Sequence, residues 1–144
     1  MRVGWQTPSL AGMLALGFAS GALSATQILM PSGVSAVALE PVWDEDLSVI
    51  RLRFVVERLR EPASLYAANM ELVFEDMLWL CETQIRALLG TDIHPQDQGW
   101  EGAVITLMDR DVEFGVMDSD SLQLFEWFSF TMDGCELDMD DYHD

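Results

Sequence analysis

A stretch of strand-forming sequence between residues 103 and 135 constrains the fold more than any other part of the chain. Its apolar positions carry mostly β-branched and aromatic residues, which fit a pleated, half-buried surface. They are Val104, Ile105, Val112, Phe114, Phe125, Phe128 and Phe130. Polar breaks at residues 109–111 and 118–121 divide the stretch into three strand-like segments, and the last leads into an Asp133-Gly134 turn. We therefore expect a sheet on which the rest of the protein packs.

Two upstream segments also have strand patterns. Residues 34–39 read as a short strand that ends before Pro41, which has no N–H to donate to a sheet. In residues 48–57 the side chains Ile50, Leu52 and Phe54 alternate with Val49, Arg51 and Arg53. A period of two is typical of a strand with one solvent-facing side. We predict a hairpin over residues 34–57 with a long acidic loop.

The spacing becomes helical over residues 69–89. Asn69 is suited to cap the N-terminus, acidic residues fill the early turns, and Gly90 provides the stop. Apolar residues recur at intervals of three and four, which places them on one side of a helix: Phe74, Met77, Leu78, Cys81, Ile85 and Leu88. Together these segments predict an α+β fold, an antiparallel sheet of about five or six strands with one long helix packed on one face.

The first 25 residues have the layout of a secretory signal peptide. Arg2 is followed by an uncharged apolar run over residues 10–23 and by the small residues Ser24 and Ala25. We expect cleavage after Ser24 or Ala25, a single domain over residues 26–137, and a periplasmic or secreted location. Residues 138–144 are predicted to form an acidic, disordered tail. The alternative is a retained N-terminal anchor, although the run is short for a membrane span of about 20 residues.

The charge of the chain is strongly one-sided. Twenty-five acidic residues face seven basic ones, all arginine, for a formal net charge of −18. A surface this negative repels phosphate backbones and anionic lipid headgroups, so we expect neither nucleic-acid binding nor membrane contact after cleavage. It attracts cations and basic partners, and we predict an unknown basic protein partner for a monomeric chain. The alternative is that the acidity only keeps the protein soluble.

The two cysteines, Cys81 and Cys135, predict one disulfide in an exported protein. The bond would join the helix to the last hairpin across 54 positions. The alternative is a pair of buried free thiols. Their spacing excludes a CxxC redox motif.

Motifs for catalysis or cofactor binding are missing from the sequence. His94 lies in a loop and His143 in the tail, and neither belongs to a zinc-binding pattern. The chain has no GxSxG nucleophile turn and no glycine-rich phosphate loop. We therefore expect no catalytic residue, no metal centre and no cofactor.

Three weaker candidates remain for contacts with a ligand or partner. Arg110 beside Asp109 is read as a surface ion pair, or alternatively as a clamp for a substrate carboxylate. Trp100 is either an exposed aromatic anchor for a partner or a residue buried under the sheet. A further alternative is weak cation binding through the carboxylate oxygens of five aspartates, although the chain lacks the glycine and distal glutamate of an EF-hand loop. They are Asp118, Asp120, Asp138, Asp140 and Asp141.

Four short motifs resemble those of an uncharacterised family of small exported alphaproteobacterial proteins, a domain of unknown function. In order they are Trp79-Leu80-Cys81-Glu82-Thr83, Asp109-Arg110-x-Val112-x-Phe114-Gly115, Gln123-x-Phe125-Glu126 and Gly134-Cys135. The resemblance spans residues 51–135, and Leu137 stands where that family usually has an aromatic residue. It implies export and a shared fold, and no activity.

These observations favour a non-catalytic binding or accessory module that acts on a basic partner, because the sequence supplies no nucleophile–base pair and no metal set. One alternative is a small periplasmic hydrolase or isomerase that uses carboxylates as acid and base. Another is an accessory subunit of a membrane complex, held by an uncleaved N-terminal segment.

Overall fold

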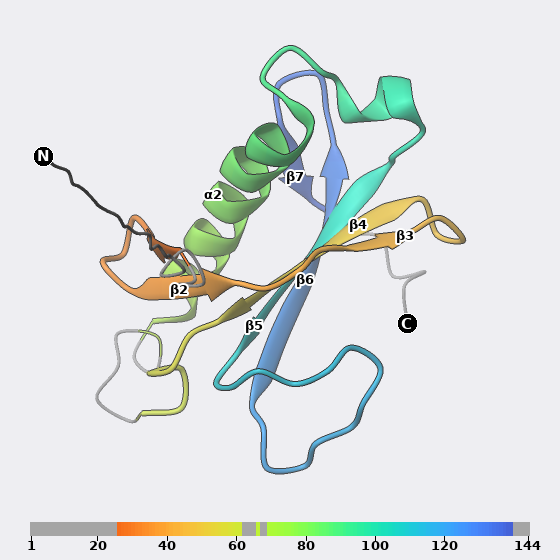
Figure 1. Ribbon diagram of the computed structural model, residues 1–144. Coiled ribbons are helices and arrows are strands. Elements are labelled where there is room, and N and C mark those ends of the chain that lie inside the picture. The colour runs from red at the N-terminus through yellow and green to blue at the C-terminus, as the bar shows by residue number, and fades with distance from the viewer. Residues whose placement is uncertain (1–25, 62–65, 67–68, 140–144) are drawn as a thin grey trace, which may run out of the picture.

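The computed structural model describes residues 26–61, 66 and 69–139. The predicted signal peptide and the last part of the acidic tail lie outside these residues. In the described part, one long helix crosses one face of a seven-stranded sheet (Figure 1). The α+β class expected from the sequence is therefore confirmed.

The sheet is mixed, so the prediction of a purely antiparallel sheet was wrong. Its strands are β1 (Gln27–Leu29), β2 (Ser35–Ala38), β3 (Val42–Asp44), β4 (Val49–Val55), β5 (Gly102–Met108), β6 (Gln123–Phe130) and β7 (Cys135–Leu137). They follow the order β1-β2-β4-β5-β6-β7, with β3 also paired to β4. The central pair, β4 and β5, is parallel, whereas the other pairs are antiparallel. A parallel pair needs a long crossover connection, and here the helix lies in that connection.

The predicted N-terminal hairpin is present with an additional strand in its loop. β2 pairs with the end of β4 and β3 with its beginning, and both pairs are antiparallel. Pro41, which lacks an N–H donor, lies between β2 and β3. Because Trp43 and Asp44 belong to β3, the connection to β4 is a tight turn rather than a long acidic loop.

The long helix α2 (Met70–Leu89) has the predicted ends. The Asn69 side chain accepts a hydrogen bond from the Glu71 N–H at 2.9 Å, and Gly90 follows with a φ of 110°. Its buried side is rotated from the predicted one, since Phe74 and Leu88 are 37% and 38% exposed. The buried residues of α2 are Val73, Asp76, Met77, Leu80, Cys81 and Ile85. A 3-10 helix, η2 (Pro95–Gln98), precedes β5.

Asp76 accounts for part of this rotation because its carboxylate points into the protein. It is 1% exposed and accepts hydrogen bonds from the Ser32 hydroxyl and the Tyr66 phenol, both at 2.5 Å, and from the Ser32 N–H at 3.1 Å. These bonds attach the turn between β1 and β2 to the helix. Burial and the bond to Asp76 raise the pKa of the Tyr66 phenol well above its ordinary value.

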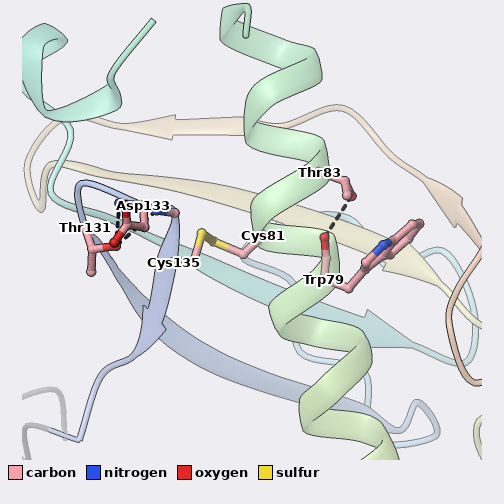
Figure 2. The surroundings of a disulfide bond; sticks show 7 residues. Trp79, Cys81, Thr83, Thr131, Asp133 and Cys135 are labelled. Carbon is pink, nitrogen blue, oxygen red and sulfur yellow. Dashed lines mark hydrogen bonds between the residues drawn. A yellow bond between two sulfur atoms is a disulfide. The ribbon is translucent and has the colours of Figure 1, made fainter. Parts of the chain in front are cut away.

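The predicted disulfide is confirmed. Figure 2 shows the bond between Cys81 of α2 and Cys135 of β7. The S–S distance is 2.01 Å. The Asp133-Gly134 turn that precedes Cys135 is held by the Thr131 hydroxyl, which accepts hydrogen bonds from both backbone N–H groups. β6 and β7 therefore form the hairpin expected from this turn.

The segment between β5 and β6 differs from the prediction. The sequence suggested a further strand around Val112 and Phe114, but residues 109–122 form one long loop, visible at the bottom of Figure 1. Asp109 and Leu122 close the loop, with the Asp109 N–H bonded to the Leu122 carbonyl and the Leu122 N–H bonded to the Asp109 carboxylate, each at 3.1 Å. Within this loop Val112 is buried at 6% exposed, whereas Phe114 and Val116 keep about half of their surface exposed and Met117 is 97% exposed.

Candidate functional site

The sheet face opposite α2, called the open face below, carries two arginines side by side. Successive side chains of a strand point to opposite faces, so Arg51 and Arg53 of β4 share the open face while Ile50, Leu52 and Phe54 face the helix. Because of the strand register, each arginine has a paired residue on β5, which in turn has a paired residue on β6, so that each arginine begins a row across three strands. One row is Arg51, Val104 and Trp127, and the next is Arg53, Thr106 and Phe125.

Residues 112–116 of the loop cover these arginines. The guanidinium of Arg53 donates a hydrogen bond to the Val112 carbonyl. The ring centroid of Phe114 lies 5.5 Å from the guanidinium carbon of Arg51 and 5.7 Å from that of Arg53. Arg51 also lies 5.6 Å from the ring of Trp127. These are cation–π distances, so the aromatic rings offset part of the repulsion between the two positive charges.

One carboxylate also balances the pair. Asp44 of β3 accepts a hydrogen bond from Arg51 Nε at 3.0 Å, and both side chains are about one-fifth exposed. A guanidinium has five N–H donors. Within the described part of the chain, Asp44 uses one donor of Arg51 and Val112 uses one of Arg53. Cation–π contacts use none, so several donors of each arginine remain for a ligand.

The space between the three strands and the loop is a cleft of about 200 Å³, called the arginine cleft below. Arg51 and Arg53 line it together with the uncharged hydrogen-bonding residues Thr106 and Gln123. Its apolar walls include Phe114 and Phe125, which are 50% and 59% exposed. An exposed aromatic pair beside partly buried donors is a surface arrangement that suits a ligand.

Two of the residues that the sequence singled out lie outside this cleft. The Asp109 side chain is 5% exposed and forms ion pairs with Arg60 at 3.2 Å and Arg110 at 3.4 Å. Burial raises the pKa of Asp109, but the Leu122 N–H and then Arg110 and Arg60 outweigh it and lower that pKa below its usual range. Asp109 therefore closes the loop, and its oxygens are already occupied.

Trp100 has an intermediate position. It packs against the edge of the core, and its ring centroid lies 5.5 Å from that of Trp43. It also lines a cavity of about 160 Å³ that is separate from the arginine cleft. Trp100 is therefore neither a free aromatic anchor nor a residue fully buried under the sheet.

Three of the acidic positions considered for cations, Asp118, Asp120 and Asp138, lie in the described part of the chain. The Asp118 carboxylate accepts a hydrogen bond from the Asp120 N–H at 2.9 Å, and the Asp120 carbonyl accepts one from Arg60. Asp138 follows β7, and its N–H donates to the Trp127 carbonyl. Asp140 and Asp141 lie outside the described residues. Among the residues that are described, no three acidic, histidine or cysteine side chains form a group that would hold a metal ion.

Two other groups bear on acid–base chemistry. Burial raises the pKa of Glu126, but its place opposite Ile105 puts this carboxyl on the helix side of the sheet. His94 lines a cavity of about 120 Å³ beside the disulfide, with Glu82 and Arg86. Neither residue lines the arginine cleft.

From the sequence, Arg51 and Arg53 were expected only to lie on the solvent-facing side of a strand. The available signal was their spacing inside the alternating pattern of residues 48–57, because residues two positions apart in a strand lie on the same face. Their aromatic cover was not predictable, since Phe114 was assigned to a strand.

Comparisons with known proteins gave one match. A family model described as "Family of unknown function (DUF6497)" matches residues 13–139. A search of curated proteins and a search of solved structures gave no match. No helix in residues 26–61, 66 and 69–139 is long and apolar enough to cross a membrane.

Proposed function

The chain belongs to the family of unknown function DUF6497, and from that premise we propose that it is a monomeric, non-catalytic binding protein with its ligand site in the arginine cleft. The observation that supports this proposal is the pair Arg51 and Arg53, held side by side under Phe114 with unused donors. Two like charges repel each other, so placing them together in a half-buried cleft favours a function that uses both.

The chemistry of the cleft supports binding rather than turnover. Guanidinium groups stay protonated at neutral pH, so they bind and orient a ligand but do not exchange protons with it. Glu113 is the carboxyl that lines the cleft, and the other lining residues supply no histidine or cysteine to pair with it. No cysteine–histidine pair and no serine–histidine pair can therefore be assembled from these lining residues.

The test is a binding survey by two-dimensional NMR with four small-molecule probes: a carboxylate, a phosphate, an amine and a neutral aromatic compound. The full mature chain is compared with Arg53→Gln and with Arg86→Gln, a matched control on the opposite, helix-covered side of the sheet. We expect at least one probe to shift the amide signals of β4, β5 and residues 112–116. The shifts should disappear in Arg53→Gln and persist in Arg86→Gln. If no probe shifts these signals, the proposal is wrong.

We also propose that the protein is exported, with its signal peptide removed near Ala25, and works in the periplasm or outside the cell. The disulfide between Cys81 and Cys135 supports this location because such bonds persist in oxidising compartments. Intact-mass measurement of protein exported from a bacterial host is the test. A mature chain that begins at Ala25 or Thr26 is expected, and retention of residues 1–24 would contradict the proposal.

A second candidate function is favoured by the net charge of −18, which suits a basic protein partner. With an oligolysine peptide as the probe, the association rate should fall steeply as salt rises, because charges are screened beyond about 8 Å at physiological salt. Removing residues 138–144, which include four aspartates, should slow association further. An association rate that does not change with salt would exclude this electrostatic function.

A further inference from the structure

We infer that the arginine cleft takes a carboxylate joined to an aromatic or similar apolar group. This inference rests on the proposed binding function and adds the chemical class of the ligand. Three features of the cleft carry it: the free edges of two guanidinium groups, the apolar walls beside them, and the charge and size of the site.

The guanidinium groups supply the recognition of the carboxylate. Arginine presents its N–H donors as a planar fork that matches the two oxygens of a carboxylate. In Arg51 the contact with Asp44 uses Nε, and the rings of Phe114 and Trp127 attract the charge without using donors. The Nη groups of Arg51, and the donors of Arg53 that Val112 does not use, are therefore suited to bind a further anionic group.

The walls of the cleft suit an apolar body attached to that group. Phe114, Val116 and Phe125 line the cleft, and each keeps about half of its surface exposed. Val104 lies on the floor between them and is buried. Covering exposed apolar surface is favourable by roughly 25 cal/mol per Å². A ligand that reaches from the arginines to these side chains gains this term in addition to its charged hydrogen bonds.

Charge and size limit the ligand to a small monoanion. Asp44 balances part of the positive charge of the arginine pair, Glu113 also lines the cleft, and the whole protein carries −18. A phosphate dianion is repelled by this field more strongly than a single carboxylate is. The volume of about 200 Å³ is below the roughly 300 Å³ at which sites for drug-sized ligands begin. The site therefore fits a small aromatic acid or the carboxylate end of a larger molecule.

The first experiment uses the full mature chain and four small probes. Phenylacetate carries both a carboxylate and an aromatic ring, and phenylacetamide is its neutral isostere. Acetate lacks the ring, and phenyl phosphate replaces the carboxylate by a dianion. Dissociation constants come from NMR titration of the amides of β4, β5 and residues 112–116. We expect phenylacetate to bind at least about tenfold more tightly than phenylacetamide, since a hydrogen bond to a charged group is worth that much or more. Acetate and phenyl phosphate should bind more weakly than phenylacetate.

The second experiment uses variants with matched controls. Arg53→Gln should weaken phenylacetate binding by about tenfold or more, and Arg53→Lys should fall between Arg53→Gln and the unchanged protein because it keeps the charge and loses the fork. Arg86→Gln removes the same charge on the other side of the sheet and should leave the affinity unchanged. Phe114→Ala should weaken phenylacetate more than acetate. Thermal melts show that each variant is folded before its affinity is compared.

The outcomes separate the ligand class from the proposed function. Equal binding of phenylacetate and phenylacetamide, or unchanged affinity in Arg53→Gln, would overturn the inference. Phenethylamine is added as a cationic probe. If phenyl phosphate or phenethylamine shifts the amide signals of the cleft residues and phenylacetate does not, the carboxylate class is wrong while the binding function stands. If no probe shifts them, both fail. Where phenylacetate binds as expected, a Gly-Gly-Phe peptide is tested with a free and with an amidated C-terminus. Tighter binding of the free peptide than of phenylacetate indicates a peptide C-terminus as the source of the carboxylate, and weaker binding indicates a free acid.

Discussion

The buried contact between Tyr66 and Asp76 predicts an alkaline loss of stability. Tyr66 is 4% exposed, and its phenol donates to the Asp76 carboxylate at 2.5 Å. Burial, followed by the hydrogen bond and the negative charge of Asp76, raises the pKa of the phenol in the folded state. A raised pKa means that the fold favours the protonated form. This contribution is therefore fully present below the unfolded pKa of about 10 and is lost as the pH rises above it.

The expected magnitude follows from proton linkage. In the unfolded chain the Tyr66 phenol loses its proton at about pH 10, whereas in the folded protein it stays protonated between about pH 9 and about pH 11. Each pH unit above about 10 then lowers the free energy of unfolding by about 1.4 kcal/mol. Between about pH 9 and about pH 11 the free energy of unfolding therefore falls by about 1.4 kcal/mol in total. Most of this fall comes from the upper half of the range, because the effect begins only near the pKa of the unfolded chain.

This chain is well suited to the measurement because few other groups titrate in the same range. It has no lysine, and its two cysteines are joined in a disulfide. The other tyrosine is Tyr142, so Tyr142→Phe is a matched control for Tyr66→Phe.

The assay is urea unfolding followed by circular dichroism at several pH values. The unchanged protein and Tyr142→Phe should both lose stability from about pH 9 to about pH 11, by about 1.4 kcal/mol. Tyr66→Phe should be less stable at neutral pH by about 1–3 kcal/mol, because Asp76 loses a donor, but should show little further loss at high pH. An equal pH dependence in Tyr66→Phe and the unchanged protein would refute the reasoning.

Three further predictions test other parts of the fold. Replacing Cys81 and Cys135 together by alanine should lower the free energy of unfolding by about 4 kcal/mol, since their bond closes a loop across 54 positions; a change below about 1 kcal/mol in urea unfolding would contradict this. Gly102→Ala places a methyl group against the Phe128 carbonyl oxygen, so β5 and β6 must separate and the amides of β5 should lose protection from hydrogen exchange. Asp109→Asn should lower the melting temperature at neutral pH and flatten the loss of stability below about pH 4, because the lowered pKa of Asp109 gives stability that disappears as pH falls. Phenylacetate binding should be unchanged in Asp109→Asn, and a loss of binding would show that Asp109 contributes to the ligand site.

The parts of the fold that the sequence predicted well depend on local signals. Asn69 and Gly90 bound the helix as expected, because capping needs only the residues at its ends. The Asp133-Gly134 turn likewise predicted the hairpin of β6 and β7. The pairing of Cys81 with Cys135 followed from there being two cysteines in a chain that was expected to be exported.

The parts that were wrong depend on contacts between distant residues. The parallel pairing of β4 with β5 is invisible in either strand, because a strand has the same alternation in both directions. Asp76 was read as one of the acidic residues that favour a helix N-terminus, and its burial becomes evident only from its contacts with Ser32 and Tyr66. The same limit applies to the candidate site, where Phe114 lies in a loop and its ring contacts Arg51, a residue more than 60 positions earlier in the chain.

The parallel pair at the centre of the sheet also determines the order in which the chain can fold. β4 and β5 join residues 49–55 to residues 102–108, so no local turn brings them together, and folding rates fall as such contacts span more sequence. A chain that emerges N-terminus first presents β4 with one edge unpaired until β5 has followed α2. Unpaired apolar edges promote aggregation, which makes a chaperone useful during this interval. Cys81 emerges in the same interval, well before Cys135, so its thiol waits for its native partner until almost the whole domain is available.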